Sequence, residues 1–110
     1  MRPYYDTVAG EMNLQTIPDN QLPRRYQMAQ AAARNLGHQD RYTKAGLVMN
    51  FDEEWNYDLD DAVDVKHSKT FINKQGVEQG TCVHLSNCDI GCNVKAKNSL
   101  DFNYIPAAEI

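Results

Sequence analysis

The sequence predicts a small α+β fold with two or three helices and a short antiparallel hairpin. An Ala-rich segment at 23–36 predicts a helix, Gly76 separates two segments of β character, and Ser99 precedes a third helical segment. Because the chain has 110 residues, it forms one domain at most, and we treat 1–110 as a single region.

Two helices are predicted in the first third of the chain. Residues 3–13 begin with Pro3, which suits the first turn of a helix, and their apolar residues recur at helical spacing. Residues 23–36 begin with Pro23 in the same way, and Gly37 is a natural stop. We expect the intervening residues to form a connector.

The middle of the chain changes character sharply. Residues 45–51 are a short apolar run and predict a strand. Residues 52–64 contain seven of the fifteen acidic residues and no basic one. Their spacing does not fit a calcium-binding loop, so we expect a solvated, mobile loop. Trp55 and Tyr57 within it still require a packing partner, which a fragment of a larger protein can lack.

A hairpin and a capped helix are predicted toward the C-terminus. The first strand of the hairpin falls at 70–73, and Gly76 occupies the turn position that needs a positive φ. Ser99 is placed to cap a helix over 100–105 through its hydroxyl. Pro106 lacks an amide hydrogen and is expected to end that helix.

Composition excludes several classes of function. A net charge of −4 argues against a nucleic-acid partner, and no apolar run approaches the roughly 20 residues of a membrane span. Three cysteines are an odd number, which favours free thiols in a reducing compartment, and we expect a cytoplasmic protein. The mean hydropathy of −0.64 is low for a self-sufficient globular domain.

All three cysteines fall within one loop, C-V-H-L-S-N-C-D-I-G-C. Cys82, His84, Cys88 and Cys92 offer a possible Cys3His zinc set, but they lack the paired C-x2-C spacing of structural zinc sites. An iron–sulfur cluster usually needs a fourth thiolate, and Leu85 does not supply one. We therefore predict no metal ligands and assign the cysteines a structural role in the loop.

The sequence at 88–109, C-D-I-G-C-N-V-K-A-K-N-S-L-D-F-N-Y-I-P-A-A-E, closely resembles a segment of a known enzyme family. This is the glucose–methanol–choline (GMC) family of FAD-dependent oxidoreductases, in particular its bacterial cholesterol-oxidase-like branch. The resemblance implies a substrate-side insertion at 1–69, and a Cys-rich loop with a capped helix at 70–110. Many relatives have a further cysteine where Leu85 stands, so a shared role for the cysteines does not follow.

The resemblance implies an internal fragment of a larger two-domain flavoenzyme that uses FAD to oxidise the CH–OH group of an alcohol or sterol-like substrate. The glycine fingerprint that holds a dinucleotide pyrophosphate is absent from the chain, and so is the family's distal catalytic His. We therefore expect no catalytic residue here, no activity of the isolated chain, and the rest of the polypeptide as its partner. By position in the resembling segment, Asn98 and Ser99 are the residues expected nearest to the cofactor. The alternative is a small stand-alone module that binds a metal or a partner through the Cys/His loop.

Overall fold

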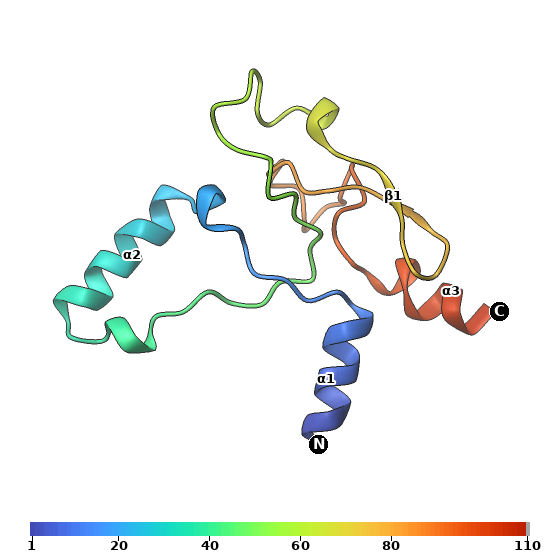
Figure 1. Cartoon of the computed structure of the whole chain (residues 1–110), viewed down its shortest axis with the longest axis horizontal. Helices are drawn as coiled ribbons and strands as arrows, with labels where there is room; N and C mark the ends of the chain where they lie inside the picture. The colour runs from blue at the N-terminus through green and yellow to red at the C-terminus, as the bar shows by residue number, and fades with distance from the viewer. Residues whose placement is uncertain (110) are drawn as a thin grey trace.

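The computed structural model describes residues 1–109 and confirms a small α+β fold (Figure 1). Three α-helices and one two-stranded antiparallel hairpin are joined by long irregular segments and short 3-10 turns. The α-helices are α1 (Arg2–Glu11), α2 (Arg24–Asn35) and α3 (Tyr104–Glu109), and the strands are β1 (Phe71–Ile72) and β2 (Glu78–Gln79). The 3-10 turns are η1 (Asp19–Gln21), η2 (Gln39–Arg41), η3 (Val65–His67) and η4 (Leu100–Phe102).

The first two helices form where the sequence predicts them, and both project from the rest of the chain (Figure 1). Pro23 precedes α2, and Gly37 follows it with a φ of 74°, a left-handed conformation that glycine adopts easily. Neither α1 nor α2 buries a residue. Tyr26 of α2 contacts Tyr42, with ring centroids 5.1 Å apart, whereas Tyr4, Tyr5 and Met28 are exposed.

The interior is small and mostly polar. Among residues 1–109, the buried side chains comprise four apolar and six polar ones. Side-chain hydrogen bonds therefore provide much of the stabilisation that apolar packing provides in most domains. The buried apolar residues are Trp55, Cys82, Val83 and Ala96, and the buried polar residues are Gln21, Asn50, Gln79, Thr81, Asn98 and Asn103.

The strand predicted at 45–51 is wrong, because this segment changes partner along its length. Leu47 forms an isolated antiparallel bridge with Gln15, and two residues later Met49 forms another with Lys97. Neither pairing continues, so no ladder develops. The segment nevertheless lies between the N-terminal connector and the returning C-terminal chain, and it fixes both.

The acidic segment 52–64 is anchored by its tryptophan, contrary to the expectation of a free loop. Trp55 is 1% exposed, and its Nε1 donates a hydrogen bond to the carbonyl oxygen of Ala62 at 2.8 Å. Lys69, from outside the segment, pairs with Asp52 at 3.0 Å and also with Glu54. The packing partner that the sequence did not reveal is therefore present within this chain.

The predicted hairpin is confirmed. Phe71 lies opposite Gln79 and Ile72 opposite Glu78 in an antiparallel register, and Gly76 has a φ of 82°. Asn73 fixes the turn, because its Oδ1 accepts hydrogen bonds from the backbone amides of Gln75 and Val77 at 3.0 and 2.9 Å. This Asx geometry closes a turn that only glycine adopts without strain at position 76.

The C-terminal helix differs from the prediction in both of its ends. Ser99 makes no capping hydrogen bond, and the chain forms η4 before α3 begins at Tyr104. Asn103 directly precedes α3 instead: its carbonyl oxygen accepts from the amide of Ala107 at 3.1 Å, and its Oδ1 accepts from the amide of Tyr104 at 2.6 Å. Pro106 therefore falls in the first turn of α3, where a missing amide hydrogen costs no intrahelical bond, and the helix continues to Glu109.

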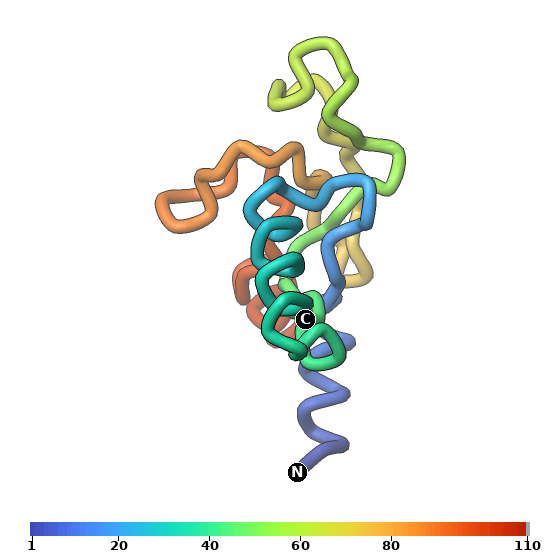
Figure 2. Tube along the Cα trace, turned by 90° about the vertical axis from the view of Figure 1, so that its left-hand side faces the viewer, coloured from blue at the N-terminus to red at the C-terminus, as the bar shows by residue number. Residues whose placement is uncertain are grey.

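The chain is more extended than a compact domain of its length (Figure 2). Its radius of gyration is 16.0 Å, against about 13 Å for a compact chain of this length. Its accessible surface is 7869 Å², against about 6,200 Å² for a compact monomer of this mass. Among residues 1–109, no helix is both long enough and apolar enough to cross a membrane.

Candidate functional site

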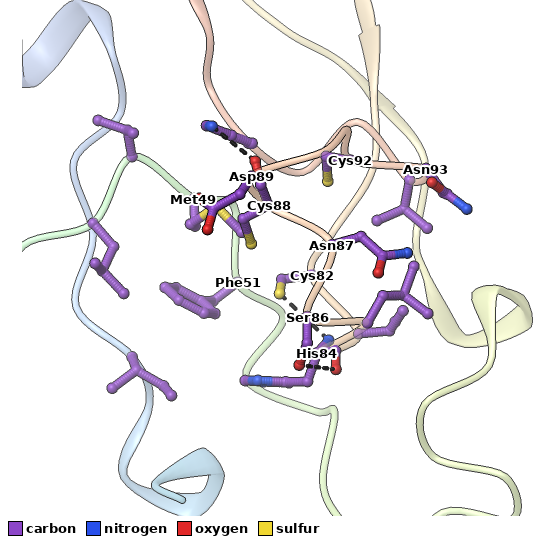
Figure 3. Close-up of a pocket in the computed structure, with 17 residues that line it drawn as sticks. Met49, Phe51, Cys82, His84, Ser86, Asn87, Cys88, Asp89, Cys92 and Asn93 are labelled. Atoms are coloured by element: carbon purple, nitrogen blue, oxygen red, sulfur yellow. Dashed lines mark hydrogen bonds between the residues drawn. The ribbon is translucent and has the colours of Figure 1, made fainter. Parts of the chain in front are cut away.

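A pocket of about 400 Å³ lies between the Cys loop and the segment that precedes the acidic block (Figure 3). Figure 3 shows Met49 and Phe51 on one side, facing Cys82, His84 and Cys88 of the loop. Most of the wall is apolar, which suits a flat or hydrocarbon-rich ligand. Its apolar wall consists of Ile17, Leu47, Val48, Met49, Phe51, Val83, Leu85 and Val94.

The two ends of the loop are held by one residue of the facing segment. The carbonyl oxygen of Asn50 accepts from the amide of Cys82 at 2.7 Å, and the amide of Asn50 donates to the carbonyl oxygen of Ala96 at 2.8 Å. Gly80 allows the chain to enter the loop, because a β-carbon there would collide with the carbonyl oxygen of Val94. The loop is therefore clamped at its base.

Two of the three thiols help to shape the loop. The sulfur of Cys82 accepts from the backbone amide of His84 at 3.4 Å, and that of Cys92 accepts from the amide of Ala96 at 3.2 Å. All three cysteines are free, and only Cys88 is exposed. Burial raises the pKa of the Cys82 thiol, so that sulfur stays protonated near neutral pH and is a poor nucleophile.

The structure offers no metal centre in the part of the chain that it describes. Among residues 1–109, no three His, Cys, Asp or Glu side chains converge in a group that could hold a metal ion. Cys82, Cys88 and Cys92 share a loop but differ in exposure, and the sulfurs of the first and the last are engaged with backbone amides.

His84 is the centre of an aromatic cluster on the wall of the pocket. Its ring lies 4.3 Å from that of Trp55, 6.1 Å from Tyr57 and 6.2 Å from Phe51, centroid to centroid. Burial lowers the pKa of His84, so its imidazole is neutral near pH 7. Its φ of 57° is left-handed, a conformation that costs a non-glycine residue about 1–2 kcal/mol.

A buried glutamine determines which nitrogen of this imidazole carries the proton. The Nε2 of Gln21 donates to the carbonyl oxygens of Asp52 and Trp55, at 2.6 and 3.2 Å. Its Oε1 must then be the atom that lies 2.9 Å from Nε2 of His84, and this oxygen can only accept. The neutral ring therefore carries its proton on Nε2.

The other ring nitrogen of His84 is available as an acceptor. Nδ1 carries a lone pair in this tautomer, and it makes no hydrogen bond to any of residues 1–109. His84 thus adds a hydrogen-bond acceptor to a wall that is mostly apolar. The sequence placed Gln21 in a connector, and no local pattern marks it as the residue that orients His84.

The residues expected nearest to the cofactor lie away from this pocket. Asn98 is 4% exposed, and its side chain is engaged with Asn50 and Gln79 at 2.9 Å each. The backbone amide of Ser99 donates to the carbonyl oxygen of Lys97 at 3.0 Å. Lys97 lines the Cys-loop pocket, whereas Asn98 and Ser99 do not. A contact between these two residues and a flavin stays a prediction.

Comparisons with protein-family models, with curated proteins and with solved structures found no match to this chain.

Proposed function

We propose that this chain is the substrate-side part of a cytoplasmic FAD-dependent oxidoreductase of the GMC type, which acts on the CH–OH group of an alcohol or sterol-like substrate. The observation that carries the proposal is the apolar pocket of about 400 Å³ built on the Cys loop. The second half of that loop belongs to the segment at 88–109 that resembles the family. A largely apolar wall that also carries polar side chains, among them His84 and Asp89, suits a largely hydrocarbon substrate with a hydroxyl group.

The large exposed surface supports a role as part of a bigger assembly. The chain exposes about 1,700 Å² more than a compact monomer of its mass. One partner in a standard-size interface loses only about 800 Å². The two projecting helices contribute to this apolar surface, since Tyr4 of α1 is 73% exposed and Met28 of α2 is 65% exposed. We assign the rest of the same polypeptide as the partner that covers it.

The chain by itself does not fit FAD. A dinucleotide pyrophosphate requires a glycine-rich turn between a strand and the N-terminus of a helix. Among residues 1–109, α2 follows Pro23 and α3 follows η4, so neither helix begins after a strand with such a turn. When bound in the whole enzyme, FAD supplies the hydride chemistry. The residues of this chain contribute a wall to the substrate site, and none of them is assigned a catalytic role.

The proposal is tested on the protein recovered from its natural source with an antibody against residues 1–110. We expect a polypeptide several times heavier than 12.5 kDa, with the absorption spectrum of oxidised flavin that bleaches on addition of an alcohol substrate. The isolated 110-residue chain is the control, and titration with FAD should leave the flavin fluorescence unchanged. A natural polypeptide of 12.5 kDa without flavin contradicts the proposal.

A stand-alone partner-binding module is the second candidate, and the same exposed surface favours it. It differs in a measurable way, because it predicts a colourless polypeptide of 12.5 kDa that co-purifies with a separate protein. The metal-binding form of this alternative has no such support, since the described residues provide no converging ligand group.

A further inference from the structure

The tip of the Cys loop carries two cysteines that the proposed function does not use. Cys88 and Cys92 bracket the tripeptide Asp-Ile-Gly, and both line the Cys-loop pocket together with Cys82. Figure 3 shows the side chains of all three cysteines directed toward this pocket. The loop therefore gathers three thiols at one wall of one cavity, and all three are free.

Two hydrogen bonds tie Cys88 and Cys92 to consecutive residues of the returning chain. Nζ of Lys97 donates to the carbonyl oxygen of Cys88 at 2.9 Å, and the backbone amide of Ala96 donates to Sγ of Cys92 at 3.2 Å. Because the two donors are neighbours in the sequence, both cysteines lie beside the same short stretch of backbone. The fold thus holds Cys88 and Cys92 near each other although no bond joins them.

The three residues between these cysteines form an exposed turn with room to adjust. The backbone amides of Ile90 and Gly91 both donate to the carbonyl oxygen of Asn87, at 3.1 and 3.0 Å, so the tip folds back on itself. Ile90 is 88% exposed, and apart from its chain neighbours no heavy atom lies within 4 Å of a β-carbon built at Gly91. Rotations within this turn can bring the two sulfurs to disulfide geometry without disturbing a packed side chain.

The exposure of the three thiols gives them different parts in an exchange reaction. Cys88 is exposed, so its sulfur is accessible to a molecule from solvent. Cys92 is only partly exposed, and it is placed to attack a sulfur bound at Cys88. Cys82 is buried, its pKa is raised by that burial, and its amide is held by the carbonyl oxygen of Asn50. Cys82 therefore stays out of the exchange.

We propose that Cys88 is a thiol–disulfide exchange site, at which a low-molecular-weight disulfide of the glutathione type oxidises Cys88 and Cys92 to an intramolecular disulfide. The proposal goes beyond the flavoenzyme assignment and does not depend on it. Disulfides of intracellular proteins are mostly transient in this way, because the surrounding thiol pool reduces them again.

The reaction has two balanced steps. The thiol of Cys88 gives its proton to water, and the thiolate attacks one sulfur of glutathione disulfide, whose S–S bond breaks and releases one glutathione thiolate. The thiolate of Cys92, deprotonated in the same way, then attacks the sulfur of Cys88 and releases the second glutathione. The two cysteines lose two electrons and two protons in total, and one glutathione disulfide is reduced to two glutathione molecules.

The test is oxidation of the 110-residue chain with glutathione disulfide, followed by an acid quench and alkylation of the remaining thiols in urea. Proteolytic cleavage before Asp89 separates Cys88 from Cys92, so only a disulfide keeps the two peptides joined. Fragmentation in the mass spectrometer then distinguishes Cys88 from Cys82 as the partner of Cys92. We expect the Cys88–Cys92 bond as the main product, with Cys82 alkylated.

Single substitutions separate the two steps. Cys92→Ser should stop the reaction at a mixed disulfide between Cys88 and glutathione, and the serine hydroxyl can still accept from the amide of Ala96. Cys88→Ser should abolish both products. Cys82→Ala is the matched control, because it removes a thiol from the same loop and should leave the yield of the Cys88–Cys92 bond unchanged. Trp55 emission reports whether each variant is folded, and the product map of the unsubstituted chain decides the matter if a variant unfolds.

Oxidation in concentrated urea gives the pairing that the chain adopts without its fold. A native product in which Cys82 forms the bond overturns the proposal, and so does the same distribution of pairs in urea and in native buffer. A native chain that stays reduced in glutathione disulfide alone also overturns it. The same holds for an unsubstituted chain that stops at glutathionylated Cys88, because Cys92 is then out of reach.

Discussion

Oε1 of Gln21 accepts a hydrogen bond from Nε2 of His84, 63 positions further along the chain, at 2.9 Å. Gln21 is 0% exposed, and its amide nitrogen is held by two backbone carbonyls of the acidic segment. A connector residue thus joins the acidic segment to the Cys loop. The bond fixes the tautomer of His84, and burial lowers the pKa of the ring and so favours its neutral form.

The stability of the chain should fall as the pH is lowered through the pKa of an ordinary histidine. Burial lowers the pKa of His84 in the folded state, so the unfolded chain takes up its proton first. This contribution is complete above about pH 6.5 and declines below it, by less than about 1.4 kcal/mol per pH unit. Urea unfolding at several pH values measures it. His84→Asn tolerates the left-handed backbone without titrating, and it should lose this part of the pH dependence; an unchanged profile contradicts the assignment.

Gln21→Ala should destabilise the chain by about 2–4 kcal/mol, because it removes three hydrogen bonds and leaves buried partners unpaired. Chemical denaturation followed by circular dichroism measures the change. Gln27→Ala on the exposed face of α2 is the matched control and should alter the free energy of unfolding by less than about 0.5 kcal/mol. Equal effects of the two substitutions would show that Gln21 does not join the two segments.

Trp55 is the single tryptophan, so its fluorescence reports on the acidic segment and on the contact of that segment with His84. Because the indole is 1% exposed, we expect blue-shifted emission and little quenching by iodide, both lost on unfolding. Trp55→Phe, which removes the hydrogen bond to Ala62, should cost about 1–3 kcal/mol. Emission typical of a solvated indole in the native chain would indicate a loose segment.

Two glycines offer a matched pair of substitutions. Gly80→Ala should destabilise the chain, since the new methyl group meets the carbonyl oxygen of Val94 and the base of the Cys loop must shift. Gly10→Ala has nothing within 4 Å of its β-carbon and lies in α1, so it should stabilise the helix by up to about 1 kcal/mol. Thermal unfolding of both variants measures the contrast. An equal loss of stability at both positions would contradict the prediction that only Gly80 needs the space of a missing β-carbon.

Features with a local cause are the ones that the sequence predicts correctly. Pro23 and Gly37 bracket α2, and Gly76 closes the hairpin, because each acts through its own backbone. The errors have distant causes. Pro106 does not stop α3, since Asn103 restarts the helix just before it.

The candidate site depends even more on distant contacts. The Cys loop is visible in the sequence, but the partner of His84 lies in the N-terminal connector. Hydrogen bonds between side-chain amides join Asn13, just after α1, to Asn73 and Gln79 of the hairpin region and to Asn98 of the C-terminal segment, through Asn50. Asparagine and glutamine carry no hydrophobic periodicity that would mark them as buried. Only the folded arrangement shows that Asn50 is left with a free donor.

Asn50 forms hydrogen bonds in two directions, through its backbone toward the Cys-loop pocket and through its side chain toward the amides beside the hairpin. Its backbone binds the chain on both sides of the Cys loop, while its side-chain oxygen accepts from the amides of Asn13 and Asn98. A ligand that displaces this residue from either side also changes the geometry on the other. The position of this one residue therefore sets both the spacing at the base of the Cys loop and the seat of the side-chain amides beside the hairpin.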